Sequence, residues 1–180
     1  RALDWLSSPK FLGGMGFRDT RAFNQALLAR QAWRLLCNPD SLCAQVLKAR
    51  YYPDGRLEDT VFSGNSSQTW QSIVHGLELL KKGLIWRVGD RRSIQIQRDQ
   101  WVPRKSGLKT TTFKRRSRLR WVNQLMKRGG NEWDEDLIHQ LFHRYDAEEI
   151  CKIKTPRNEV DDCVAWHEER TGIFSVRSAY

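Results

Sequence analysis

The chain has 180 residues, enough for one domain or two small ones, and its net charge of +10 and isoelectric point near 9.8 favour a polyanionic partner. No apolar run is long enough to span a bilayer, and no N-terminal signal pattern is present. Four widely spaced cysteines predict reduced thiols, so we expect a nuclear or cytoplasmic protein that is not secreted and has no membrane partner.

The N-terminal part of the chain predicts loop followed by two helices. Residues 1–18 are expected to form loop and short extended pieces. Residues 22–37 contain no Gly or Pro, and their apolar side chains cover most of a helical wheel, which predicts a helix buried on several sides. Asn38 as N-cap and Pro39 at the first helical position predict a second helix over about residues 39–50. Its expected buried side chains are Leu42, Cys43, Val46 and Leu47.

A third helix is predicted over residues 67–82, with Ser66 or Ser67 as N-cap and Gly83 after the last turn. Its expected core face has helical spacing and consists of Trp70, Ile73, Val74, Leu77, Leu80 and Leu84. The sequence pattern then changes to an alternation of apolar and polar residues. Residues 85–98 predict a β-hairpin whose turn contains Arg91 and whose second strand contains Gln97.

The positive charge is concentrated in residues 87–128, which contain 14 Lys and Arg against 2 Asp and Glu. Residues 101–120 have no helical or strand periodicity, which predicts an exposed, flexible linker. Such a segment suits contact with the phosphate backbone of RNA or DNA, and the alternatives are a solvated linker or a nuclear-localisation patch. Trp101 and Phe113 are candidates to stack on bases, with packing as the alternative for Trp101. The candidate phosphate contacts are Arg91, Arg92, Lys114, Arg115, Arg116, Arg118 and Arg120.

Residues 121–180 predict a second, smaller helical region with an excess of acidic residues from residue 129 onward. A short amphipathic piece at residues 121–126 precedes a helix capped by Asn131 or Asp134. Asp146 and Glu149 resemble a capping box for a further short helix, and residues 172–176 predict a strand. The side chains expected to be buried in the middle helix are Leu137, Ile138, Leu141 and Phe142.

Several histidines and cysteines here are of zinc-ligand type. His139 and His143 share a helix face, and Cys163 and His167 form a C-x3-H pair with Cys151 upstream. Their spacing is not that of a zinc knuckle, so we expect solvated histidines, ordinary thiols and no metal site in this chain.

A resemblance to a known family runs through most of the chain. It rests on four segments, in this order: GGMGFRDTRAFNQALLARQAWRLLCNPDSLCAQVLKARYYPDG, TWQSIVHGLELLKKGLIWRVGD, IQIQRDQWVP and DDCVAWHEERTGIFSVRSAY. Together they resemble plant LINE-type (non-LTR) retrotransposon reverse transcriptases, in the region between the polymerase domain and the zinc-binding segment. Where the family usually has Gly and often Trp in the hairpin, this chain has Arg91 and Gln97, so we expect a less relaxed turn.

The resemblance implies a fragment of a polyprotein whose parent is an RNA-directed DNA polymerase that uses Mg²⁺. The start at Arg1 and the end at Tyr180 suit such a fragment. The catalytic Tyr-any-Asp-Asp motif of the family is missing from this chain, so we expect no catalytic residue and no cofactor here. The expected partners are the backbone of RNA or DNA and the rest of the polyprotein.

The predicted fold class is α+β, mainly helical with a small β-hairpin. By the resemblance, residues 1–100 form a thumb-like helical region, residues 101–120 a basic flexible linker, and residues 121–180 a small helical region leading into a truncated zinc-binding-type segment. Two other hypotheses remain: a non-enzymatic protein-interaction module that uses the acidic region, or a degenerate retroelement relic without current function.

Overall fold

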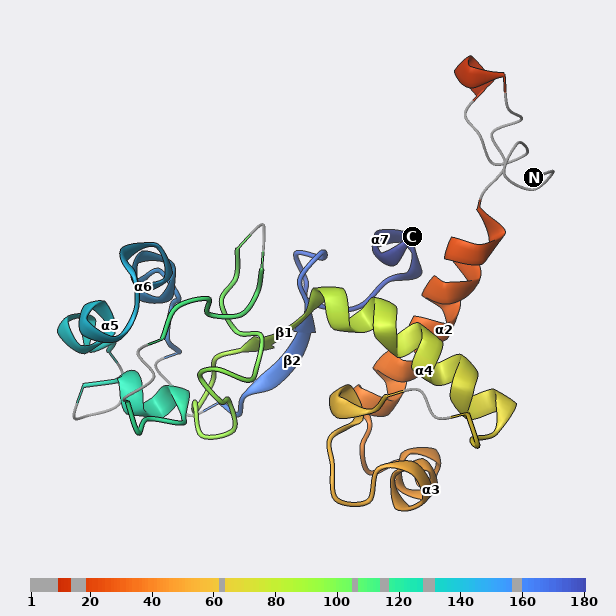
Figure 1. Cartoon of the computed structure of the whole chain (residues 1–180), viewed down its shortest axis with the longest axis horizontal. Helices are drawn as coiled ribbons and strands as arrows, with labels where there is room; N and C mark the ends of the chain where they lie inside the picture. Colours follow the sequence, from red (N-terminus) through yellow and green to blue (C-terminus); the bar gives the residue numbers. More distant parts are fainter. Residues whose placement is uncertain are drawn as a thin grey trace. The chain divides into compact units, whose positions relative to one another are not determined.

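The computed structural model describes residues 10–13, 19–61, 64–104, 107–113, 117–127, 132–156 and 160–180. In these ranges the chain forms six α-helices, short 3-10 turns and one two-stranded antiparallel sheet, which confirms the α+β class (Figure 1). The chain divides into two compact units, which are described separately: residues 1–82 with 174–180 form unit 1, and residues 83–173 form unit 2. No helix within the described ranges is both long and apolar enough to cross a bilayer.

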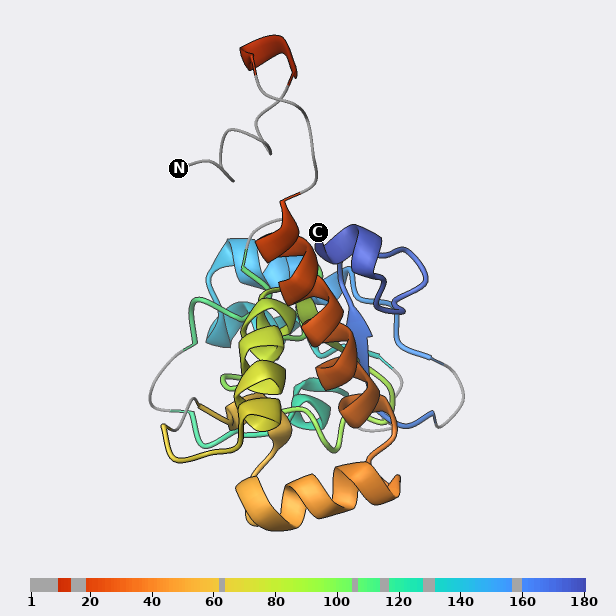
Figure 2. The same cartoon turned by 90° about the vertical axis from the view of Figure 1, so that its right-hand side faces the viewer.

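Unit 1 is built on three longer helices, with α3 running across the ends of the other two (Figure 2). The bounds of its α-helices are Thr20–Cys37 for α2, Leu42–Tyr51 for α3, Gln68–Gly83 for α4 (whose last residue, Gly83, is counted in unit 2) and Val176–Ala179 for α7. Two 3-10 turns, Lys10–Leu12 and Leu57–Asp59, complete the described elements. The predicted third helix is confirmed, since the Ser67 hydroxyl accepts the Trp70 N–H at 3.3 Å and the expected core face of α4 is buried.

The first helix is confirmed, but it is buried along one face rather than on several sides. Its buried residues are Ala26, Ala29, Ala32 and Leu35, while Leu27 is exposed. The alanines let α4 approach very closely. A Cβ added at Gly76 of α4 would lie 2.3 Å from the carbonyl carbon of Leu28. Small residues on both helices therefore set the distance between α2 and α4.

Replacing Gly76 by Ala is expected to destabilise the protein by about 1–3 kcal/mol, because the new methyl group meets backbone that cannot move alone. Helix propensity alone would favour Ala over Gly by about 1 kcal/mol, so the sign of the change separates the two effects. Chemical denaturation measures it, with His75→Ala at the exposed neighbouring position as the control. A stabilised Gly76→Ala protein would show that the helices do not touch there.

The second helix begins later than predicted. Asn38 ends α2 instead of starting α3, since its N–H and its side-chain amide both donate to the Arg34 carbonyl, at 3.0 and 3.1 Å. Ser41 is the N-cap of α3 and accepts the Ala44 N–H. Ala44 and Tyr51 lie on the inward face of α3, where Ala44 is buried. The Tyr51 ring stacks on the Trp70 ring with centroids 4.4 Å apart. The predicted burial is wrong for Leu42, Cys43 and Val46, which are exposed.

The C-terminal residues return to unit 1 and close it. The Asp19 N–H donates to the Tyr180 hydroxyl at 2.9 Å, and the Phe23 and Tyr180 rings meet edge to face. Trp33 stacks on Phe174 with centroids 6.1 Å apart. A strand predicted at residues 172–176 is therefore wrong, because this segment turns into α7.

The sheet of unit 2 pairs β1 (Leu84–Arg87) with β2 (Cys163–Trp166), from Leu84 opposite Trp166 to Arg87 opposite Cys163. The predicted hairpin over residues 85–98 is therefore wrong in its second strand. Unit 2 also contains one 3-10 turn at Val122–Leu125 and the helices α5 (Glu135–Leu141) and α6 (Arg144–Cys151). Its main core consists of Ile94, Ile96, Trp101, Val102, Val122, Leu125, Trp133, Ile138, Phe142, Ala147 and Ile150.

The caps of the two helices of unit 2 follow the sequence only in part. Asp134 caps α5 as predicted, since its carboxylate accepts the Leu137 N–H at 3.0 Å. The predicted capping box of Asp146 and Glu149 is wrong, because α6 already begins at Arg144. The carboxylate of Asp146 serves instead to bind another segment, as described below.

Candidate nucleic-acid interface

Two segments that are far apart in the sequence pair along their backbones in unit 2. The Ile96 N–H donates to the Arg120 carbonyl at 2.9 Å, and the Val122 N–H donates to the Ile94 carbonyl at 3.0 Å. The Asn123 N–H donates to the Arg91 carbonyl at 3.1 Å. Residues 91–96 therefore run antiparallel to residues 120–123, with Ile94 and Ile96 buried in the core.

This pairing places three exposed arginines on neighbouring segments, and we call Arg92, Arg118 and Arg120 the cationic ledge. The guanidinium of Arg120 lies 5.1 Å from the centroid of the Trp121 ring, a cation–π distance. The side-chain oxygen of Gln124 accepts the backbone N–H groups of Arg120 and Trp121 at 2.7 and 2.9 Å. The backbone that presents Arg120 is therefore fixed from both sides.

Arg91 differs from the prediction because it is 6% exposed and does not present its charge to solvent. Its guanidinium donates to the Pro156 carbonyl at 3.5 Å. Its φ of 67° is the left-handed conformation, which confirms the expected strain at a position where the resembled family has Gly. Of the other candidate contacts, Lys114, Arg115 and Arg116 lie outside the described residues.

The turn that carries Arg91 and Arg92 is wrapped around the carboxylate of Asp162. One oxygen accepts the N–H groups of Gly89 and Arg91 at 2.8 and 2.9 Å, and the other accepts the Ser93 N–H at 2.9 Å. Burial raises the pKa of Asp162 above its usual value, and the charge of Asp90 adds to this, although the three N–H donors act in the opposite direction. This carboxylate therefore holds the turn at residues 89–93.

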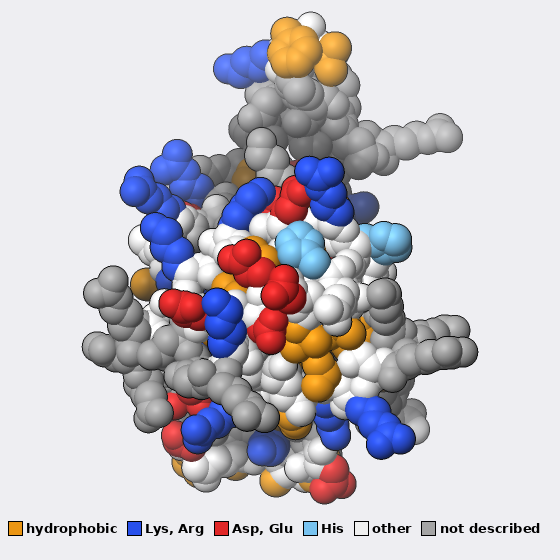
Figure 3. All heavy atoms as spheres, turned by 90° about the vertical axis from the view of Figure 1, so that its left-hand side faces the viewer, with side chains coloured by type: hydrophobic (Ala, Val, Ile, Leu, Met, Phe, Trp, Pro, Cys, Tyr) orange, Lys and Arg blue, Asp and Glu red, His pale blue; other side chains and the backbone are white. Residues whose placement is uncertain are grey.

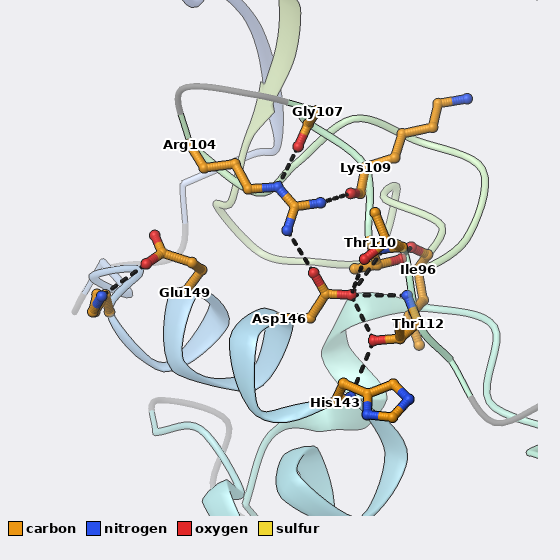
Figure 4. Close-up of polar contacts among 11 residues, drawn as sticks. Ile96, Arg104, Gly107, Lys109, Thr110, Thr112, His143, Asp146 and Glu149 are labelled. Carbon is orange, nitrogen blue, oxygen red and sulfur yellow. Dashed lines mark hydrogen bonds and ion pairs between the residues drawn. The ribbon is translucent and has the colours of Figure 1, made fainter.

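Part of the predicted flexible linker is packed instead. Trp101, Val102, Arg104 and Leu108 are buried. Residues 107–112 are held by a hub around Asp146 of α6 (Figure 4). The Arg104 guanidinium donates to Asp146 at 2.5 Å and also to the carbonyls of Gly107 and Lys109.

The second oxygen of Asp146 accepts the backbone N–H and the hydroxyl of both Thr111 and Thr112, at 2.8–3.0 Å. The Thr112 hydroxyl in turn accepts the His143 N–H (Figure 4). Burial by itself would raise the pKa of Asp146, but the hydrogen bonds from Thr112, Arg104 and Thr111 outweigh it and hold this pKa below its usual value. The hub thus fixes residues 107–112, within the predicted linker of residues 101–120, to α6.

Both aromatic candidates for base stacking are packed against other rings. Trp101 is buried, donates its indole N–H to the Ile96 carbonyl at 3.0 Å, and lies 6.1 Å from the Trp133 ring. Phe113 is half-buried, with its ring 5.2 Å from that of Phe142. The packing alternative is therefore correct for Trp101.

The face that carries α5 and α6 has acidic side chains near its centre and Lys and Arg side chains around them (Figure 3). On α6, Glu148 pairs with Arg144 and Glu149 pairs with Lys152, each at 2.7 Å. Among the described residues, no group of three or more His, Cys, Asp and Glu side chains is placed to hold a metal ion.

Comparison with known proteins gives two relatives, although no family model and no solved structure matches the chain. An Arabidopsis thaliana protein named "Uncharacterized mitochondrial protein AtMg00310" is 36% identical over 108 residues, which cover 57% of this chain and 70% of the relative. The chain belongs to the family of this plant protein. The "Putative ribonuclease H protein At1g65750", also from Arabidopsis thaliana, is 31% identical over 185 residues, covering 96% of this chain and 29% of the relative.

The chain thus spans less than a third of the length of the second relative. Relatives of these two kinds are typical of plant proteins derived from retrotransposons. The sequence patterns identified the exposed arginines of the ledge. They did not predict that Asp162 would hold the turn at residues 89–93, and they assigned Asp146 to a capping box rather than to residues 107–112. The run of three threonines at residues 110–112 was the available signal for a buried acceptor.

Proposed function

We propose that the chain is a non-catalytic part of a plant retrotransposon-derived protein that binds the sugar–phosphate backbone of RNA or DNA. The observation that carries this proposal is the cationic ledge: Arg92, Arg118 and Arg120 are exposed on two segments that pair along their backbones, within a stretch that has 14 basic and 2 acidic residues. Exposed guanidinium groups on a fixed backbone bind phosphate through charge-assisted hydrogen bonds and release counterions.

The finer assignment follows the sequence resemblance. The chain corresponds to the region between the polymerase domain and the zinc-binding segment of a LINE-type reverse transcriptase, and the Mg²⁺-dependent polymerase chemistry belongs to another part of that protein. The two plant relatives support the origin, and the longer one is consistent with a parent of several regions. The ledge would then grip the template or the target while the reaction proceeds elsewhere.

Salt dependence tests the proposal. We expect fluorescence anisotropy with a labelled oligonucleotide to show affinity that falls steeply between about 50 and 200 mM salt, with little preference among sequences. The double variant Arg118→Gln and Arg120→Gln should reduce the slope of log affinity against log salt by about 1.4–1.8, because each lost phosphate contact removes about 0.7–0.9.

The control is Arg144→Gln, which removes an exposed cation that is paired with Glu148 on α6. It should leave the slope nearly unchanged. If the control variant lowered the slope as much as the ledge variant, the binding would be a property of net charge and not of the ledge.

A second candidate function is protein interaction through the acidic centre of the α5–α6 face (Figure 3). It predicts weak oligonucleotide binding that the ledge variant does not change. The same anisotropy series therefore decides between the two functions.

A further inference from the structure

A cavity of about 620 Å³ lies wholly within unit 2, lined by β1, β2 and residues 153–156 among others. This volume is in the range of small-molecule sites, about 300–1,000 Å³. Its walls are mostly apolar and include three indole rings, those of Trp86, Trp101 and Trp166. The proposed backbone binding at the cationic ledge does not account for a cavity with this lining.

Two of the three indole rings are held in place by their surroundings. Trp101 is fixed by its bond to the Ile96 carbonyl. The Trp166 ring packs against Gly83, where an added Cβ would lie 2.7 Å from the ring. Trp86 is fixed through its backbone, since its N–H donates to the Gln100 carbonyl at 2.6 Å, while its side chain is half-buried. Trp86 is therefore the ring with surface available to a ligand.

The lining also includes exposed cations, namely Arg87, Lys154 and Arg170. They outnumber the two carboxylates of the lining, Asp161 and Glu169. The Arg87 guanidinium packs on Gly172, where an added Cβ would lie 2.5 Å from its Nη2 atom, so this charge is held in position. An uncharged apolar ligand would make no use of these cations.

We propose that this cavity binds one unpaired nucleobase of an RNA or single-stranded DNA chain, with an adjacent phosphate at the cations of the lining. The proposal rests on the proposed function, because the ledge in the same unit supplies the contact with the rest of the strand. A flat base stacks on an indole whatever its identity, and its own phosphate brings the negative charge that the lining favours. Bases in a duplex are already stacked and do not present a face.

The test compares a single-stranded oligonucleotide with an abasic one of the same length and charge, using the full chain and fluorescence anisotropy. The chain should bind the oligonucleotide with bases about 5- to 150-fold more tightly, the effect of one stacked base. Trp86→Ala should remove this difference without changing affinity for the abasic strand, and Trp86→Phe should preserve most of it.

A second pair of variants keeps the test valid if Trp86→Ala does not fold. Lys154→Gln removes a cation of the lining, while Lys152→Gln removes one that is paired with Glu149 and does not line the cavity. Only Lys154→Gln should weaken binding of the strand with bases relative to the abasic strand. Equal effects of the two substitutions would overturn the proposal that this cavity is a binding site for a nucleobase (the base site).

Other outcomes separate the base site from the proposed function. Equal, salt-dependent binding of both strands by the unmodified chain would overturn the base site and leave backbone binding intact. No binding of either strand would overturn both. Binding of an apolar dye that oligonucleotides do not displace would show that the cavity takes an uncharged ligand, which also overturns the base site.

Discussion

Replacing Asp146 by Ala is expected to lower the free energy of unfolding by about 3–5 kcal/mol. The side chains of Arg104 and Asp146 are 3% and 1% exposed, so the substitution leaves a buried guanidinium without its counter-charge. Thr111 and Thr112 lose their shared acceptor at the same time, and donors left unpaired in this partly buried site add to the cost. Urea unfolding of the full chain, followed by tryptophan fluorescence, measures the loss.

The matched control is Glu148→Ala on the same helix. Glu148 pairs with Arg144 at 2.7 Å, but these side chains are 46% and 90% exposed, so the expected change is below about 1 kcal/mol. Asp146→Asn should fall between the two, because it keeps the shape and one acceptor but not the charge. A difference of less than about 1 kcal/mol between Asp146→Ala and Glu148→Ala would mean that the hub does not hold the segment.

The hub also predicts a pH dependence. The pKa of Asp146 is held below its usual value in the folded protein, so the folded state favours the ionised form. Its contribution is fully present above the unfolded pKa of about 3.9 and is lost as the pH falls through the folded value. The stability difference between the unmodified protein and Asp146→Asn should therefore be constant near neutral pH and shrink below about pH 4. A difference that grew on acidification would contradict the hub.

Sequence patterns within a few residues correctly predicted features that depend only on neighbouring residues, such as helix faces and helix caps. The apolar stripe of α4 and the Asp134 cap of α5 need only residues within a few turns of one another, and both are confirmed. The wrong hairpin shows the limit of such signals. β1 pairs with a strand that begins at Cys163, and no local pattern encodes a partner so far away in the sequence.

In the basic stretch of residues 87–128, local sequence patterns also failed to predict long-range contacts. Charge counting identified Arg92, Arg118 and Arg120, which are exposed, but it also included Arg91, which is buried. Residues 107–112 have no periodicity because individual long-range bonds hold them, chiefly those of Arg104, Thr111 and Thr112 to the Asp146 carboxylate, rather than a helix or sheet. An irregular backbone that is held by bonds to distant residues looks like a flexible linker in the sequence.

Replacing Asp162 by Ala is expected to cost about 2–4 kcal/mol, because the N–H groups of Gly89, Arg91 and Ser93 lose their acceptor together. Each unsatisfied donor in a protected site costs about 1–3 kcal/mol, and water entering the turn recovers part of the loss. Asp161→Ala is the control, since this neighbouring carboxylate is exposed. Equal unfolding midpoints for the two variants would show that the turn is stable without the carboxylate.

The same substitution links the fold to nucleic-acid binding. Arg92 lies between two residues whose N–H groups bind Asp162, so loss of the carboxylate releases the backbone that presents one arginine of the ledge. Asp162→Asn can still accept from Gly89 and Arg91 through its oxygen, but its amide faces the Ser93 N–H as a second donor, so an intermediate stability is expected. Under conditions where Asp162→Ala remains folded, its salt slope should fall by about 0.7–0.9, the value of one phosphate contact. An unchanged slope would remove Arg92 from the interface and leave Arg118 and Arg120 as its described members.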